Sequence, residues 1–143
     1  MLQIILLPII AGIFCQLLKL VTSAAKGKFS WGEINSYGGM PSSHAAFVSS
    51  LVIVAGYYEG WTSVAFTIAL IFAILTVRDA IGFRRTLGKH AEVLNEMISQ
   101  MPDSKKAEYK SLSTRLGHTP VEALVGILIG IAIPLLYIIF TTL

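Results

Sequence analysis

Four long apolar segments constrain the fold of this chain more than any other feature. Each is long enough, or nearly long enough, to cross a hydrocarbon core of about 30 Å. The segments are Leu2–Leu18, Ala45–Tyr58 with its flanks, Trp61–Val77 and Val121–Leu143. Of the 143 residues, 55% are hydrophobic and 13% are charged, which is unlike a soluble domain of this length. The sequence therefore predicts an all-α, polytopic membrane helix bundle with about four transmembrane helices, forming a single membrane-embedded domain over residues 1–143.

An amphipathic helix is predicted after the third apolar segment. Apolar side chains recur there at steps of three and four residues, with charged residues on the rest of the circle; they are Leu87, Ala91, Leu94, Ile98 and Met101. Pro102 ends this helix, and Asp103 or Ser104 can cap a further short polar helix that runs to about Leu116. Gly117 then suits the C-terminus of that helix.

The cations lie on one side of the predicted bundle. When the four segments are threaded alternately, the stretches 22–40 and 78–118 fall on the same face, and all 11 Lys and Arg residues lie there or at its edge. The positive-inside rule places this face in the cytoplasm and both termini outside. The same cations can serve topology, anionic lipid headgroups or a phosphate substrate, and nothing in the pattern indicates nucleic acid as a partner.

Two histidines stand where a polar, glycine-containing loop gives way to an apolar helix: His44 in GGMPSSHAA and His118 in LGHTPVEALVG. The start of a helix presents unpaired backbone N–H groups and the positive end of the helix dipole, so it favours an anion. This pattern indicates a phosphate site at a membrane surface. The alternative for the first element is that Ser42 only caps its helix and His44 marks the membrane interface.

Glu122 has two interpretations that the sequence leaves open. Thr119 is a good N-cap, Pro120 suits the first helical position, and Glu122 follows the cap by three residues, as in a capping box. Glu122 is also four residues from His118, so its carboxylate can orient the imidazole and let the other ring nitrogen attack phosphorus.

An acidic residue and two arginines follow the third apolar segment. Asp79 at a membrane helix end is costly unless it is paired, which predicts a structural ion pair with Arg78, Arg84 or Arg85. In the functional interpretation, one of these arginines binds phosphate through its bidentate guanidinium while Asp79 fixes it. His90 is interpreted as a surface residue of the amphipathic helix.

Close packing of the second and fourth apolar helices is predicted by small residues four apart, among them Gly126 with Gly130 and Ala45 with Ser49. Such packing would bring the two histidine-bearing helix starts together. Three histidines and the single Cys15 form no zinc-binding spacing, and no phosphate-loop or dinucleotide fingerprint occurs, so no metal or cofactor is predicted.

Three motifs in order resemble those of a known superfamily. The stretches GGMPSSHAA, RDAIGFRRTLGKHAEVLNEM and LGHTPVEALVGILIG are similar to the divergent bacterial and plastid branch of the type 2 phosphatidic acid phosphatase and vanadium-dependent haloperoxidase superfamily, from Gln16 to Gly130. The resemblance implies that His118 is the nucleophile, that Glu122 stands where the superfamily has an orienting aspartate, and that His44 is the general acid. It also implies a bacterial cell membrane.

The chain departs from the superfamily pattern at several positions. Ser43 replaces a glycine, Lys19 is not followed by an Arg-Pro pair, and Arg115 precedes His118 by three residues where the pattern has six. An arginine from elsewhere in the chain can take the missing place. The candidate phosphate-binding residues are therefore Lys19, Ser42, Ser43, Arg84, Arg85 and Arg115.

The expected function is that of a metal-independent, acid phosphatase-like phosphomonoesterase. It would hydrolyse a lipid or isoprenoid phosphate at the membrane surface through a phosphohistidine. One alternative is a membrane protein, related to transport, that binds phosphate or anionic lipid without turnover; another is a structural subunit whose motifs only cap helices. Membrane lipids surround the bundle, and its lipid-facing surface allows a homodimer.

Overall fold

Every regular element in the described part of the chain is a helix. The computed structural model of the protein describes residues 2–25, 39–106, 108–114 and 116–143. Six helices follow in order: α1 (Leu2–Ala25), α2 (Ser43–Glu59), α3 (Val64–Ile81), α4 (Phe83–Ser99), α5 (Asp103–Lys106) and α6 (Pro120–Thr142). The predicted all-α membrane bundle is confirmed.

Among the described residues, three helical stretches are long and apolar enough to cross a membrane: Leu2–Ala24, Val64–Ser99 and Pro120–Thr142. The predicted second span, α2, has 17 residues, which corresponds to about 25 Å and falls short of the hydrocarbon thickness. A helix of this length can remain inside the bundle because its neighbours, rather than lipid, surround it.

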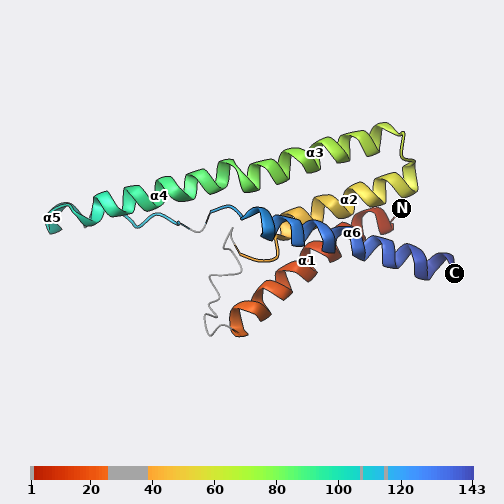
Figure 1. The fold of residues 1–143 in the computed structure, drawn as a ribbon, viewed down its shortest axis with the longest axis horizontal. Coiled ribbons are helices and arrows are strands. Elements are labelled where there is room, and N and C mark those ends of the chain that lie inside the picture. Colours follow the sequence, from red (N-terminus) through yellow and green to blue (C-terminus); the bar gives the residue numbers. More distant parts are fainter. Residues whose placement is uncertain (1, 26–38, 107, 115) are drawn as a thin grey trace.

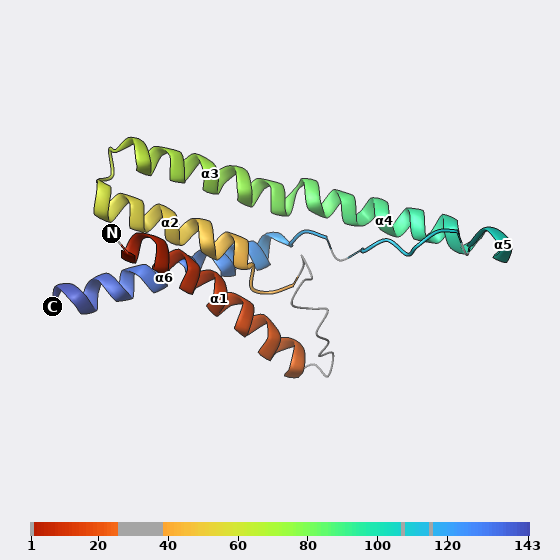
Figure 2. The same cartoon turned by 180° about the vertical axis from the view of Figure 1, so that it is seen from behind.

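Helix α2 is the centre of the bundle. It contacts α1, α3 and α6, as Figures 1 and 2 show, and mostly small residues along it are buried. The large apolar side chains of the outer helices point away from α2, as in Ile5 of α1, Ile68 of α3 and Leu128 of α6. In a bilayer these side chains face lipid, so the buried interior is made of close backbone contacts rather than large side chains.

Two glycines set the distance between α2 and α6. A Cβ atom added to Gly126 would collide with the carbonyl oxygen of Ser42, and one added to Gly130 would collide with that of Ala46. The backbones therefore approach each other at both positions, as the small-residue pair predicts.

Helices α3 and α4 form one rod that is interrupted only at Gly82. Val64–Ser99 comprises 36 residues, or about 54 Å, so α4 extends beyond the hydrocarbon layer that α3 can cross. Figure 1 shows α4 continuing almost in line with α3, past the end of the bundle. The amphipathic helix predicted for 87–101 thus begins earlier, at Phe83.

The prediction of a polar helix running to Leu116 is wrong. Helix α5 ends at Lys106, and the described residues 108–114 are not helical. The Asn95 side chain donates to the Leu112 carbonyl (2.8 Å) and accepts from the Leu112 N–H (2.9 Å). The Leu112 backbone groups, which a longer helix would use, are thus bound to α4. Gly117 lies in a loop rather than at a helix C-terminus.

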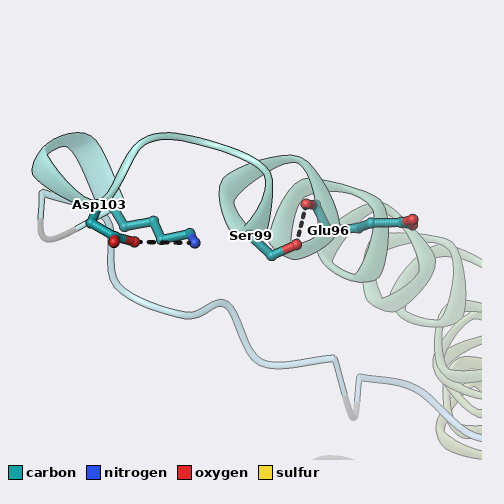
Figure 3. A network of polar contacts seen from close by, with 4 residues as sticks. Glu96, Ser99 and Asp103 are labelled. Carbon is teal, nitrogen blue, oxygen red and sulfur yellow. Dashed lines mark hydrogen bonds and ion pairs between the residues drawn. The ribbon is translucent and has the colours of Figure 1, made fainter.

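The tip of the rod carries local polar contacts. Ser99 Oγ donates to the Glu96 carbonyl oxygen (2.7 Å), and Lys106 Nζ lies 3.4 Å from Asp103 Oδ1 (Figure 3). These groups are exposed and close in sequence, so they shape the turn between α4 and α5 and contribute little to stability.

The ends of the helices fall into two groups. Both termini and the turn between α2 and α3 lie at one end of the bundle, and the starts of α2 and α6 lie toward the other, on the side from which α4 extends (Figures 1 and 2). The two histidine-bearing helix starts therefore share one side.

Candidate functional site

The starts of α2 and α6 are joined through their backbones. The Ser42 N–H donates to the Glu122 carbonyl oxygen (3.2 Å). The fully buried Ser42 hydroxyl accepts from the Ala45 N–H (3.3 Å), so this side chain caps α2. Ser42 therefore holds the two helix starts in register, and its hydroxyl already has one partner.

The position of His118 is fixed from the junction of α3 and α4. Its backbone N–H donates to the Ala80 carbonyl oxygen (3.0 Å). The preceding Gly117 has φ of 82° and lies against the backbone of Arg84 and Arg85, where a Cβ atom would collide with the Arg85 nitrogen. Only glycine fits both this conformation and this approach.

The two imidazoles differ in their surroundings. His118 is 5% exposed, and its Nδ1 is buried with no hydrogen-bond partner among the described residues. His44 is exposed, in the first turn of α2. A buried, enclosed imidazole and an accessible one at the same helix junction are suited to different chemical roles.

Charges from four elements act on this pair of histidines. Burial lowers the pKa of His118, the Glu122 carboxylate raises it, and the positive charges of His44, Lys19 and Arg84 lower it further. Partial burial lowers the pKa of His44 as well, the positive charges of Arg84 and Lys19 lower it further, and the Asp79 carboxylate raises it. His118 is therefore neutral at pH 7, with a lone pair available on one ring nitrogen, in a region of positive potential.

Lys19 reaches the site from α1. The residue is 8% exposed, and its alkyl chain lies against Gly39, where an added Cβ would be 3.0 Å from Lys19 Cε. The stem is thus packed while the ammonium charge acts on both imidazoles. The sequence indicated Lys19 only through the family resemblance; its position beside residue 39 is a tertiary contact.

Arg84 and Arg85 lie on different faces of α4. Arg84 Nε lies 2.6 Å from Asp79 Oδ2, an ion pair that holds the Arg84 guanidinium in place. Arg85 is exposed. Of the two arginines, Arg84 is held by an ion pair, and its charge acts on both imidazoles.

Glu122 forms the capping box. Its Oε2 accepts from the Thr119 N–H (2.8 Å), and Thr119 Oγ1 accepts from the Glu122 N–H (3.3 Å). The carboxylate acts on His118 through its charge, without a hydrogen bond to Nδ1.

The two helix starts offer different numbers of donors to an anion. The start of α6 uses the Thr119 and Glu122 N–H groups in its own cap, and Pro120 has no N–H. In the first turn of α2, the N–H groups of Ser43 and His44 have no preceding helical carbonyl to bind. Backbone donors for an anion therefore come chiefly from α2.

Arg115 lies outside the described residues. Within the described ranges, no group of three or more His, Cys, Asp or Glu side chains could hold a metal ion.

Comparison with known proteins gives two matches. A family model described as "Divergent PAP2 family" matches residues 2–133. The Bacillus subtilis (strain 168) protein named "Uncharacterized membrane protein YuiD" is 36% identical over 135 residues, which cover 86% of this chain and 85% of that protein. No solved structure matches. Together with the apolar helices, these matches identify an integral membrane protein.

Proposed function

The chain belongs to the Divergent PAP2 family, and from this membership and the geometry of its site we propose that it is a metal-independent phosphomonoesterase acting on a lipid or isoprenoid phosphate at the membrane surface. The observation that carries this proposal is the convergence of Lys19, Arg84, His44 and His118 at one end of the bundle. Two imidazoles and two cations from separate elements complement the negative charge of a phosphoryl group.

In the first step, the phosphate oxygens accept hydrogen bonds from Lys19, Arg84 and the N–H groups of Ser43 and His44. Nδ1 of His118 is enclosed, so Nε2 is the attacking nitrogen. Its lone pair forms the N–P bond while the ester P–O bond breaks. The bound phosphate offsets the charges of Lys19 and Arg84 and so favours protonated His44, which donates its proton to the departing alcohol oxygen. General acid help of this kind contributes typically about 10²–10⁴-fold.

In the second step, a water molecule attacks the phosphohistidine. Neutral His44 accepts a proton from the water, the new P–O bond forms, and the P–N bond breaks. Inorganic phosphate leaves, His118 returns to its neutral form, and His44 is protonated again. The exposed position of His44 at the mouth of the site gives water access for this step.

A second candidate function is binding of phosphate or anionic lipid without turnover. The observation that favours it is that Glu122 is bound to the Thr119 N–H, so that Nδ1 of His118 has no acceptor in the part of the chain that the structure describes. Attack by Nε2 builds positive charge on the ring, and an Nδ1–H without an acceptor stabilises that charge less.

The proposed site also has a defined orientation in the membrane. The C-terminal part of α1, the end of α3 and the whole of α4 lie on the side of the helix starts, opposite both termini (Figure 1). These segments carry Lys19, Arg78, Arg84 and Arg85. By the positive-inside rule, the site faces the cytoplasm and both termini lie outside.

A substrate panel separates the two functions. Purified protein in detergent, treated with EDTA, is incubated with alkyl, isoprenoid and diacylglycerol phosphates, and released inorganic phosphate is measured. The phosphatase proposal predicts catalytic release from at least one class. If inorganic phosphate raises the unfolding temperature through binding and no ester is consumed, the binding function is correct instead.

Arg84 and Arg85 form a matched pair for testing the phosphate site. We expect Arg84→Ala to weaken inorganic phosphate binding by roughly tenfold or more, because a charge-assisted hydrogen bond is lost. Arg85→Ala should leave binding within about twofold, since that side chain lies on another face of α4. The measurement is the phosphate dependence of the unfolding temperature, and equal losses in the two variants would contradict the assignment.

A further inference from the structure

An apolar groove of about 530 Å³ opens beside His44. It lies between α1, α2 and α3, with α2 forming its floor; Figure 2 shows α2 between the other two helices. From α1 it is lined by Ile9, Gly12, Ile13 and Gln16. This spacing of three, four and seven residues is one face of a helix, so the wall is continuous.

The residues that line the groove change along its length, although nearly all of the surface that faces the groove is apolar. At the end nearest the site it is lined by Gln16, Ser43, His44 and Thr76. Farther along each helix the lining becomes Ile9, Phe47 and Phe72. Between Gln16 and Ile9 the wall covers about 10 Å. An apolar groove that ends beside His44 matches the hydrocarbon chain of an amphiphile whose headgroup lies just outside the groove, at His44.

The location of the groove indicates which amphiphile fits. Ile9 and Phe72 belong to helices long and apolar enough to span the membrane, so this part of the groove faces hydrocarbon. The end of the groove nearest the site shares His44 with the histidine pair, and the charges of Lys19 and Arg84 act on that imidazole. The charge beside this end therefore favours an anionic headgroup over a neutral or cationic one.

We propose that this groove binds one hydrocarbon chain of the phosphate-bearing substrate and holds the phosphate beside His44. This inference rests on the proposed function. It adds that the hydrocarbon chain is the part of the substrate that the groove recognises. Lipid tails are as apolar as the groove wall, so burial of the chain supplies little affinity. The effect of the groove is to position the ester, because a chain seated against Phe47 fixes how far the headgroup extends.

The volume of the groove fits one small ligand rather than a bulky one. The second chain of a two-chain lipid would have to remain in the bilayer. Gly12 of α1 borders the floor that α2 forms. A Cβ added to Gly12 would lie 3.5 Å from Phe47 Cδ2, which is ordinary contact. A side chain much larger than alanine at residue 12 would therefore occupy the space of the bound chain.

The test uses Gly12→Phe, which fills the groove, and Ile10→Phe as its matched control. Ile10 lies on the same helix, is exposed, and is absent from the groove lining. With a long-chain alkyl phosphate, Gly12→Phe should reduce phosphate release at least tenfold, and Ile10→Phe should leave it within about twofold. Neither change should alter the shift in unfolding temperature caused by inorganic phosphate. Equal long-chain rates in the two variants would overturn the proposal.

A binding measurement that needs no turnover separates this inference from the proposed function. An alkyl phosphate carrying a photoreactive group in mid-chain is irradiated with the wild-type protein, and the labelled peptides are identified. Labelling should concentrate on residues 9–16 and 72–76, decrease with excess inorganic phosphate, and be lost in Gly12→Phe but not in Ile10→Phe. If labelling is uniform over the lipid-facing helices, or equal with the corresponding alkyl alcohol, the groove does not select the substrate.

If Gly12→Phe does not fold, the same labelling experiment is carried out with a second variant. Phe47→Ala then serves as the second variant, because it enlarges the floor without adding atoms. It should shift labelling to a different position along the photoreactive chain, and an unchanged pattern would count against the groove. Specific labelling in a wild-type protein that releases no phosphate would mean that the groove inference holds and the phosphatase proposal fails.

Discussion

Alanine in place of His118 should lower phosphate release by at least about a thousandfold, the order expected when the nucleophile of a covalent mechanism is removed. The physical reason is that no other neutral imidazole is enclosed at the site: His44 is exposed and serves the proton transfers. The fold should survive, because the Ala80 contact uses the backbone N–H of residue 118 and the close approach of Gly117 is unaffected.

Two measurements check this result. Phosphate release gives the rate, and rapid quenching of the protein with a phosphorus-labelled substrate should trap a phosphoryl group that is labile to acid and stable to base. The trapped label should be absent from the His118→Ala protein. His90→Ala is the matched control, since His90 is exposed on α4. Turnover that persists in His118→Ala would contradict the phosphohistidine mechanism.

Much of the fold was predictable because it depends on local patterns. Apolar length predicts the spanning helices, and the spacing of Thr119 and Glu122 predicts the capping box that the structure contains. The Gly126 and Gly130 pair predicts where two backbones meet. Each of these features is determined by residues within a single segment of the chain.

Features that depend on distant contacts could not be predicted in the same way. Asn95 binds the backbone of residue 112 and so prevents the helix that the polar composition of that region suggested. The choice between Arg84 and Arg85 depends on the rotation of α4, which is set by its continuity with α3 through Gly82. The groove requires three helices at once, so no single segment indicates it.

The candidate site, like the fold, combines local features that the sequence predicts with tertiary features that it does not. The helix-start pattern around His44 and His118 is local, and it indicated the candidate residues. Which helix start retains donors for an anion depends on how each cap is completed. The pairing of Glu122 with Thr119 decides this for α6, and it leaves the first turn of α2 as the chief backbone contributor.

Gly130→Ala should lower both the unfolding temperature and phosphate release strongly. The new methyl group would collide with the carbonyl oxygen of Ala46, and a backbone oxygen within a helix cannot rotate away. Overpacking of this kind costs about 1–3 kcal/mol or more. Helices α2 and α6 would have to separate, and the hydrogen bond from the Ser42 N–H to the Glu122 carbonyl would lengthen with them.

Gly12→Ala is the matched control, because it makes the same change in a helix where the new Cβ meets only ordinary contact with Phe47. It should keep or slightly raise stability, since alanine is favoured over glycine in a helix by up to about 1 kcal/mol. Thermal unfolding in detergent and phosphate release are measured on both variants. If Gly130→Ala were as stable and active as Gly12→Ala, the two histidines would not depend on the close contact of α2 and α6. A loss confined to Gly130→Ala would show that the two histidines are positioned by backbone contact between helices rather than by the loops that precede them.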